Sequence, residues 1–364
     1  MRAIGQMEPW FGIEEQQAVN AYLGSGAWIT EFQRTSEFES RIAQYVGAKH
    51  CVVTTNGTIA LAMALMALGI GKGSAVLVPD YTMIASANAV RLAGAEPVLV
   101  DIDPQTACMS LEAAERSITS QTQALMLVSI NGRSPNMIRF QDLCKRRGLV
   151  LLEDAAQSLG SRWNGRHLGS FGAIGCFSFS VPKIITTGQG GAVVTDDPAI
   201  DQRLRLVKDF GREHAGIDKH VAMGYNFKFT DLQSVIGIEQ LKKLPWRVQR
   251  KKEMFRLYQD LLSPLPQVTF LPTNLQDTSP WFIDILLDPK TRDPLVTFLK
   301  QNRIGTRPFY PAIHTQIPYL EASSPFPNAI DISQRGLWLP SSSFLTDDDI
   351  SYICDHIRKF FQQV

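Results

Sequence analysis

The chain has 364 residues, of which 45% are hydrophobic and 20% are charged, as in folded globular proteins large enough for two domains. Its formal net charge of +1 gives no general attraction to nucleic acid or to an anionic membrane surface. The sequence shows no apolar run long enough to cross a membrane, and its first residues lack the apolar core of a signal peptide. Five cysteines without close pairs favour free thiols in a reducing cytosol over a disulfide framework or a zinc site. We therefore expect a cytoplasmic protein.

The first half of the chain alternates short apolar runs with helical patterns. Val, Leu and Ile fill these runs almost continuously, as in strands that are covered on both faces. The alternation predicts an α/β fold with a mostly parallel central sheet covered by helices, and ligands of such sheets bind at the carboxyl ends of the strands. The predicted strands are 51–55, 75–80, 97–102, 124–130 and 149–156, followed by 175–180 and 191–197.

A long helical pattern over 230–263 contains Pro245, which we expect to kink or end the helix. We place the domain boundary at this proline, which gives a large domain over 12–244 and a smaller α+β domain over 245–364. Residues 1–11 are a candidate addition to the small domain. The predicted elements of the small domain are a strand at 281–288 and helices at 293–303 and 347–363.

Asp154 ends the apolar run "LVLLED". A carboxylate at this position can cap the next helix or pair with a structural arginine. It can also hold the protonated ring nitrogen of pyridoxal phosphate, which makes the ring an electron sink. Position alone leaves these interpretations open.

The stretch "TTNGTIAL" (54–61) predicts a turn from a strand into a helix. The amides of Gly57 and Thr58 would lie at the positive end of this helix, where a phosphate is favourable. The alternative is a turn without a ligand. The stretch "GIGKGS" (69–74) lacks the spacing of a phosphate-binding loop and is excluded.

Lys183 lies five residues after Ser178, just before the glycine-rich turn "TTGQGG". Most lysines are solvated surface residues. Here two apolar strands flank the lysine, and the glycines permit close approach of the backbone. A lysine in a partly desolvated pocket loses its proton readily and forms Schiff bases, so this context favours a covalent catalyst.

Taken in chain order, the Gly-Thr turn, Asp154 with Gln157 three residues later, and Ser178 with Lys183 resemble the fold-type I pyridoxal-phosphate enzymes. More narrowly, they resemble the DegT/StrS family of nucleotide-sugar aminotransferases. The segments "PDYTMIASANAV", "EDAAQSLGS", "MGYNFKFTDLQ" and "TRPFYPAIHTQIPY" stand in family order. "KIITTGQGG" and "RGLWLPSS" are most similar to the perosamine-synthase-like branch, which aminates C4 of a 4-keto-6-deoxy sugar nucleotide.

The resemblance implies pyridoxal 5'-phosphate as cofactor, with a role for each matching residue. Lys183 would carry the cofactor as a Schiff base and shuttle the proton. Asp154 would pair with the pyridine nitrogen, and Gln157 would lie against the ring near its hydroxyl. The residues implied for the phosphate are Gly57, Thr58, Ser178 and, from the neighbouring subunit, Asn226. Those implied for the sugar nucleotide are Trp28, Arg307, Tyr310 and His314, with structural alternatives for Arg307 (pairing a carboxylate) and His314 (closing a turn).

Two segments depart from the family pattern. Met83 stands where relatives stack an aromatic ring on the cofactor; a thioether packs less rigidly, and simple core packing is the alternative. The stretch "SINGR" (129–133) replaces a His-x-Tyr-Gly-like segment that borders the substrate in relatives, so this difference bears on the sugar rather than on the cofactor.

The resemblance further implies a homodimer with shared active sites, glutamate as amino donor, and a nucleotide sugar as acceptor. We expect neither nucleic acid nor a membrane as a partner. Alternatives to C4 amination are a C3-aminating relative, a dehydratase of the same family, and a non-catalytic cofactor-binding regulatory protein. Lys183 speaks against the dehydratase, because those enzymes carry His at that position.

Overall fold

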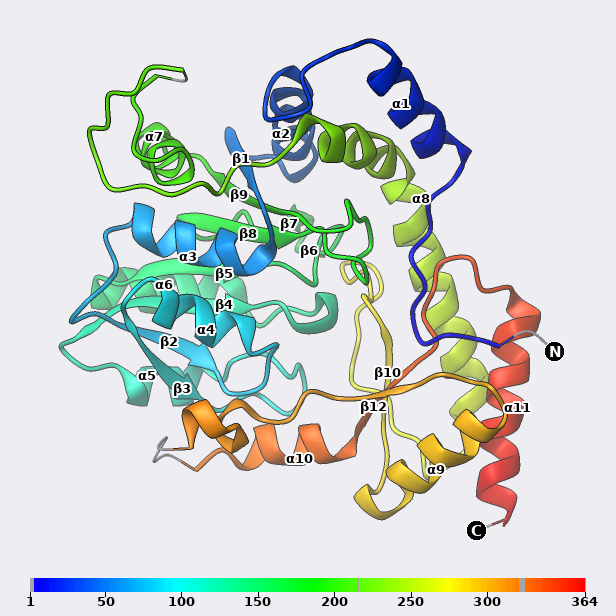
Figure 1. The fold of residues 1–364 in the computed structure, drawn as a ribbon. Coiled ribbons are helices and arrows are strands. Elements are labelled where there is room, and N and C mark those ends of the chain that lie inside the picture. Colours follow the sequence, from blue (N-terminus) through cyan, green and yellow to red (C-terminus); the bar gives the residue numbers. More distant parts are fainter. Residues whose placement is uncertain (1–2, 215, 321–324, 364) are drawn as a thin grey trace.

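The computed structural model describes residues 3–214, 216–320 and 325–363. A seven-stranded sheet forms its centre, in the order β1-β9-β8-β5-β4-β2-β3 (Figure 1). All neighbouring strands from β8 to β3 pair in parallel, whereas β9 runs antiparallel between β1 and β8, so the predicted mostly parallel sheet is confirmed. The strands are β1 (His50–Thr54), β2 (Ala75–Pro79), β3 (Glu96–Val100), β4 (Thr122–Val128), β5 (Val150–Asp154), β8 (Ile174–Ser178) and β9 (Gly191–Thr195).

Helices cover both faces of this sheet. One face packs against α3 (Gly57–Ala67), α4 (Ala85–Leu92) and α7 (Pro198–Lys208). The other face packs against α5 (Leu111–Ser117), α6 (Met137–Arg147) and α2 (Gln33–Val46), and α1 (Ile13–Gly24) lies outside α2 and α8. Helix α3 is apolar on nearly every side and is almost completely buried, as expected for a helix that is hydrophobic all round.

Helix α8 (Asp231–Leu262) joins the sheet region to the C-terminal part of the chain. Thr230 caps it by accepting a hydrogen bond from the Gln233 amide at 3.2 Å. Pro245 lies inside the helix and does not end it, although the helix bends along its length (Figure 1). The division of the chain at 244/245 therefore stays a proposal, because one helix runs across it.

The C-terminal part contains a second, antiparallel sheet in the order β10-β12-β11. Its strands are β10 (Ile283–Leu286), β11 (Arg307–Pro308) and β12 (Gly336–Leu339), and its helices are α9 (Pro289–Gln301), α10 (Pro327–Arg335) and α11 (Asp347–Gln363). Ile4 pairs with Ile304 and belongs to the same apolar cluster as residues of β10, β12, α9 and α11.

Several short elements lie outside the sequence-based prediction. They are the hairpin of β6 (Arg162–Trp163) and β7 (Arg166–His167) and the single turns η1 (Ile130–Gly132), η2 (Ile313–Thr315) and η3 (Ile317–Tyr319). No helix among the described residues is long and apolar enough to span a bilayer.

Candidate active site

A cavity of about 260 Å³ opens beyond the carboxyl ends of β5 and β8, next to the N-terminus of α3 and the start of the C-terminal sheet. This is where ligands of open α/β sheets bind. Nine of the twelve residues predicted for the site line this cavity. They are Gly57, Thr58, Met83, Asp154, Gln157, Ser178, Lys183, Arg307 and Tyr310.

The N-terminus of α3 forms one end of the cavity. The Asn56 side chain caps the helix by accepting a hydrogen bond from the Ile59 amide at 3.0 Å, and the amides of Gly57 and Thr58 begin the first turn. A Cβ atom on Gly57 would lie 2.8 Å from the Ser178 Cβ, so only glycine permits this close approach. Free helix amides beside a serine hydroxyl suit a phosphate group.

Asp154 is the last residue of β5 and is 5% exposed. Its carboxylate accepts hydrogen bonds from the Ser86 hydroxyl at 2.7 Å and from the Ala156 amide at 3.1 Å. These partners, rather than an arginine, hold the carboxylate in place. Burial raises the pKa of Asp154, while these hydrogen bonds and the nearby Lys183 act in the opposite direction. The site would therefore favour a cationic partner in the cavity.

Lys183 follows β8 in a turn where its amide donates to the Ser180 carbonyl at 3.0 Å. Burial lowers the pKa of the Lys183 ammonium to about 8; Asp154 opposes this shift and Arg307 adds to it. A lysine with this pKa is partly a neutral amine near neutral pH, which is the form that attacks a carbonyl group.

Trp281 lies against Lys183 and was not among the predicted site residues. The Lys183 Nζ lies 3.9 Å from the centre of the Trp281 ring, and the indole N–H donates to the Pro182 carbonyl at 2.7 Å. The sequence places Trp281 at the start of an apolar strand, a pattern that indicates packing and carries no signal of a site.

Gln157 accepts a hydrogen bond at its Oε1 from the Asn131 amide at 2.8 Å. Asn131 and Arg133 belong to "SINGR" and are 2% and 3% exposed. Arg133 pairs with Asp284 of β10 at 2.6 Å. The segment 129–133 thus packs behind Gln157 and is not part of the cavity lining, which differs from the expected position beside the substrate.

Three predicted residues lie outside the cavity. Trp28 is 69% exposed, and Asn226 pairs through its backbone with Asp209. His314 lies in the single turn η2, and its Nδ1 is 2.6 Å from an oxygen of the buried Asp80. This position agrees with the alternative in which His314 closes a turn. The roles suggested for these three residues stay predictions.

Arg307 lies over the rings of Tyr310 and Trp338, at 5.3 and 5.6 Å from their centres. Among the residues that the structure describes, no carboxylate forms an ion pair with Arg307, and its role stays a prediction. Burial raises the pKa of Tyr310 to about 12, so its hydroxyl stays protonated and can donate a hydrogen bond.

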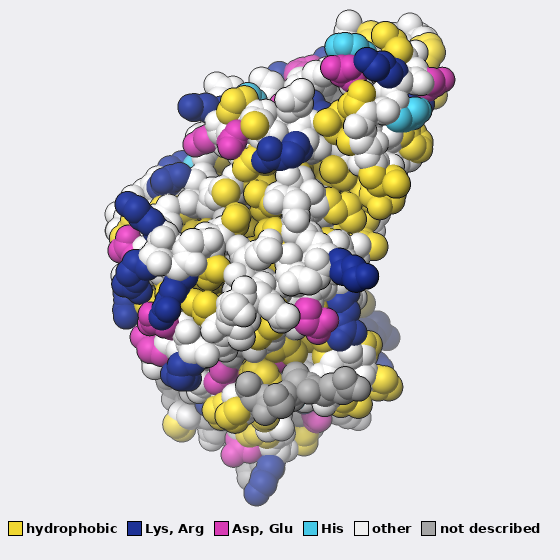
Figure 2. Space-filling view, turned by 90° about the vertical axis from the view of Figure 1, so that its left-hand side faces the viewer, with side chains coloured by type: hydrophobic (Ala, Val, Ile, Leu, Met, Phe, Trp, Pro, Cys, Tyr) yellow, Lys and Arg dark blue, Asp and Glu magenta, His cyan; other side chains and the backbone are white. Residues whose placement is uncertain are grey.

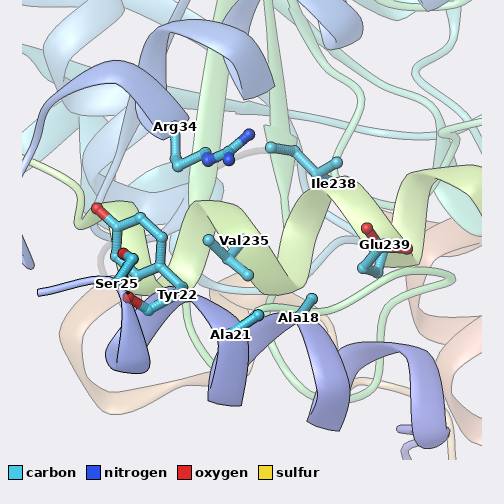
Figure 3. Close-up of a pocket in the computed structure, with 8 residues that line it drawn as sticks. All are labelled: Ala18, Ala21, Tyr22, Ser25, Arg34, Val235, Ile238 and Glu239. Carbon is cyan, nitrogen blue, oxygen red and sulfur yellow. Dashed lines mark hydrogen bonds between the residues drawn. The ribbon is translucent and has the colours of Figure 1, made fainter. Parts of the chain in front are cut away.

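A second hollow of about 250 Å³ lies between α1, α8 and the start of α2 (Figure 3). Its sides are mostly apolar, with Ala18 and Ala21 facing Val235 and Ile238 across it. It brings together neither a lysine nor a group of phosphate-binding amides. The cavity at Lys183 therefore stays the candidate active site.

The model of the DegT/DnrJ/EryC1/StrS aminotransferase family matches residues 11–358. The chain belongs to this family. The GDP-perosamine synthase of Vibrio cholerae is 36% identical over 360 residues, which cover 97% of this chain and 98% of that enzyme. The dTDP-4-dehydro-2,3,6-trideoxy-D-glucose 4-aminotransferase of Saccharopolyspora spinosa is 32% identical, with 98% and 96% covered. The crystal structure of S. venezuelae DesV superposes with a TM-score of 0.91 at 31% identity and covers 97% of this chain and 95% of that chain.

The DegT-family member described here is a sugar aminotransferase that depends on pyridoxal 5'-phosphate. The cavity fits this cofactor: the α3 amides and Ser178 suit its phosphate, Asp154 suits a protonated ring nitrogen, and Lys183 suits its aldehyde carbon. The predicted family, fold, enzyme class and cofactor are confirmed.

Proposed function

We propose that this aminotransferase moves the amino group of glutamate to C4 of a nucleotide-linked 4-keto-6-deoxy sugar, with a GDP-linked sugar as the preferred acceptor. The main support is the similarity to GDP-perosamine synthase, which extends over almost the full length of both chains. The similarity to a second enzyme that is named a 4-aminotransferase also supports amination at C4.

When bound, the cofactor would supply an electron sink for the electrons left on the carbon that loses its proton. Lys183 would accept the proton from the donor carbon at its Nζ and hold it for return within the same cavity. Its lowered pKa suits this task, because a general base works best when its pKa lies near the working pH. Asp154 would hold the ring nitrogen protonated, and the Gly57 and Thr58 amides would hold the phosphate.

The sugar nucleotide would enter from the side of the cavity where Arg307 and Tyr310 lie. The guanidinium of Arg307, which lies over two aromatic rings, would form charge-assisted hydrogen bonds with the diphosphate. Tyr310 would donate a hydrogen bond to the sugar. Because donor and acceptor would use the same cavity in turn, we expect ping-pong kinetics.

The proposed assembly is a homodimer. Residues 209–214 and 216–227 project from the sheet region at the upper left of Figure 1 and carry exposed apolar side chains, among them Ile217, Val221 and Met223, at 55%, 50% and 79% exposure. Hydrophobic side chains also gather on the upper part of the face seen in Figure 2. Large exposed apolar patches mark interaction surfaces. A second copy would cover this one and bring Asn226 to the phosphate of its partner.

The proposed location is the cytoplasm. It is supported by the five cysteines, all of which are free and buried, as in proteins of a reducing compartment.

A direct assay tests the substrate. The purified protein is incubated with glutamate and either a 4-keto-6-deoxy or a 3-keto-6-deoxy sugar nucleotide, and the position of the new amine is determined by NMR. We expect amination at C4, with faster turnover of the GDP-linked sugar than of its UDP- and dTDP-linked counterparts. Amination at C3 alone would reject the regiochemistry, and equal turnover of all nucleotides would reject the preference. Deoxygenation at C3 would identify a dehydratase, and bound cofactor without turnover of any sugar nucleotide would favour the regulatory alternative.

A further inference from the structure

Asn131 connects two sides of the cavity although it does not line the cavity itself. Its backbone N–H donates to the Gln157 Oε1 at 2.8 Å. Its side chain makes two hydrogen bonds with the backbone of Phe282: the Phe282 amide donates to Oδ1 at 2.6 Å, and Nδ2 donates to the Phe282 carbonyl at 2.8 Å. Since Phe282 directly follows Trp281, one residue holds both Gln157 and the start of the segment that carries Trp281.

The backbone conformation makes this double contact possible. Asn131 has φ 51° and ψ 30°, in the left-handed region that asparagine tolerates better than most residues. The next residue, Gly132, has φ +82°, and a Cβ atom there would lie 2.3 Å from the Ser279 carbonyl oxygen. The turn therefore favours asparagine or glycine at position 131 and requires glycine at position 132.

A buried ion pair fixes the direction of the Asn131 amide. Asp284 accepts a hydrogen bond from the Asn131 Nδ2 at 2.9 Å and two from the Arg133 guanidinium, at 2.6 and 2.7 Å. The Arg133 and Asp284 side chains are 4% and 2% exposed. Burial alone would lower the pKa of Arg133, but the carboxylate of Asp284 more than offsets this, so the pair stays charged. A carboxylate can only accept, so the NH₂ end of Asn131 must face it.

The same logic fixes Gln157. A backbone N–H can only donate, so the oxygen end of the Gln157 amide faces Asn131. The NH₂ end is then left to donate into the cavity, where an oxygen on the cofactor ring would accept it. On the other side, the Phe282 bonds hold the residue before it, Trp281, whose ring lies against Lys183.

We propose that Asn131 is a positioning residue for catalysis, anchored by the Arg133–Asp284 pair: it presents the donor end of Gln157 to the cofactor and holds Trp281 against Lys183. The inference rests on the proposed function only in taking Lys183 as the residue that binds the cofactor and moves the proton. It gives the "SINGR" segment a task that acts through two cavity residues rather than through contact with the sugar.

The variant Asn131→Gly tests this proposal, because glycine keeps the left-handed backbone and removes only the side-chain bonds. Asn164→Gly is the matched control, since Asn164 has φ 48° in an exposed turn away from the cavity. Both proteins are loaded with cofactor and compared with the wild type by visible absorption spectra across pH, by kcat and KM, and by thermal unfolding. We expect Asn131→Gly to move the pH midpoint of the spectral change and to lower kcat on the order of 10- to 100-fold, with little change in KM. The control should match the wild type in both.

A lower unfolding temperature with an unchanged spectrum, pH midpoint and kcat would overturn the proposal, because Asn131 would then be only structural. If Asn131→Gly fails to fold, Asn131→Asp is tested in its place. Aspartate keeps the side-chain shape and the oxygen that accepts from the Phe282 amide, but it places a second carboxylate next to Asp284. The same spectral change and loss of kcat would support the proposal, and wild-type values would reject it. A wild-type protein that aminates no sugar nucleotide would count against the proposed function, independently of these variants.

Discussion

The Lys183 Nζ lies 3.9 Å from the centre of the Trp281 ring, so a side chain from the C-terminal part of the chain packs directly on the proposed catalytic lysine of the sheet region. This contact has two opposite effects. The indole covers Lys183 and excludes water, which favours the neutral amine, whereas the face of the ring attracts the ammonium. Because burial is the largest cause of the lowered pKa, we infer that exclusion of water dominates.

Removal of the indole should therefore raise the pKa of Lys183 towards its ordinary value. In Trp281→Ala, water reaches the lysine, and cofactor capture by the cofactor-free protein should shift to higher pH. Trp281→Phe keeps a ring but loses the bond to the Pro182 carbonyl, and it should fall between the alanine variant and the wild type. The measurement is the rate at which the Schiff-base absorbance appears after addition of the cofactor, determined as a function of pH. Trp246→Ala, which removes a half-exposed indole on α8, is the control, and an unchanged midpoint in Trp281→Ala would contradict the inference.

The lowered pKa also predicts how the wild type captures its cofactor. Below pH 8 most Lys183 is an ammonium without a free electron pair, so the capture rate should rise with pH and level off above about 8. Borohydride should then fix the cofactor to Lys183. Lys183→Ala should keep its fold but lose both capture and transamination. Mapping of the label to another lysine would show that the assignment is wrong.

Lys251 predicts a pH dependence of stability. Its fully buried ammonium donates to the Trp281 carbonyl at 2.9 Å and to the Ser341 carbonyl, and burial lowers its pKa from 10.5 to about 7. Between these two values the unfolded chain binds more protons than the folded protein, so the free energy of unfolding rises with pH. It should rise by up to about 1.4 kcal/mol per pH unit from this group, and the penalty of burying the charge is complete below pH 7.

Lys251→Met removes this group and should abolish its share of the pH dependence. The free energy of unfolding of the variant should exceed that of the wild type by the largest amount below pH 7, and this excess should shrink as the pH rises. Urea unfolding of the cofactor-free proteins from pH 6 to 10 measures the difference. Lys242→Met on the exposed side of the same helix is the control. Its free energy of unfolding should differ from that of the wild type by the same amount at every pH. A flat difference for Lys251→Met as well would mean that Lys251 stays charged throughout.

The proposed dimer predicts that two inactive variants rescue each other. If Asn226 serves the partner's site, a mixed dimer of Lys183→Ala and Asn226→Ala subunits has one site without a lesion and one site with both. Random exchange of equal amounts should restore about a quarter of the wild-type sites. Activity after refolding the mixture is the measurement, with each variant alone as its control. No recovery, or a fully active monomer, would contradict the shared site.

Local patterns were enough to predict the central sheet and the side chains at its carboxyl edge. The strand that ends at Asp154 and the turn that begins at Gly57 are both continuous in sequence, so periodicity and turn chemistry identify them. Family resemblance supplied the remaining cavity residues, such as Arg307. Pro245 did not predict the end of a helix, because packing on both sides of α8 outweighs the break that a proline favours.

The proposed roles of Trp281 and Asn131 could not be predicted from local sequence patterns. Trp281 meets Lys183 across almost a hundred residues, and the partner of Arg133 is Asp284, about 150 residues away. Nothing in the local pattern of either segment indicates such a partner. Asn131 also adopts a conformation that only the surrounding fold makes favourable.

The path of α8 has a consequence for the building of chimaeras with other sugar aminotransferases. Its first half packs on α1 and α2 and its second half on α11, so an exchange at 244/245 would keep each half of the helix against neighbours from its own parent and would mix the two parents only at the junction within α8. Ile4 adds a second crossing, because its backbone bonds to Arg303 and Gly305. A transplanted C-terminal part would therefore have to bring along the first residues of its own parent, together with the second half of α8.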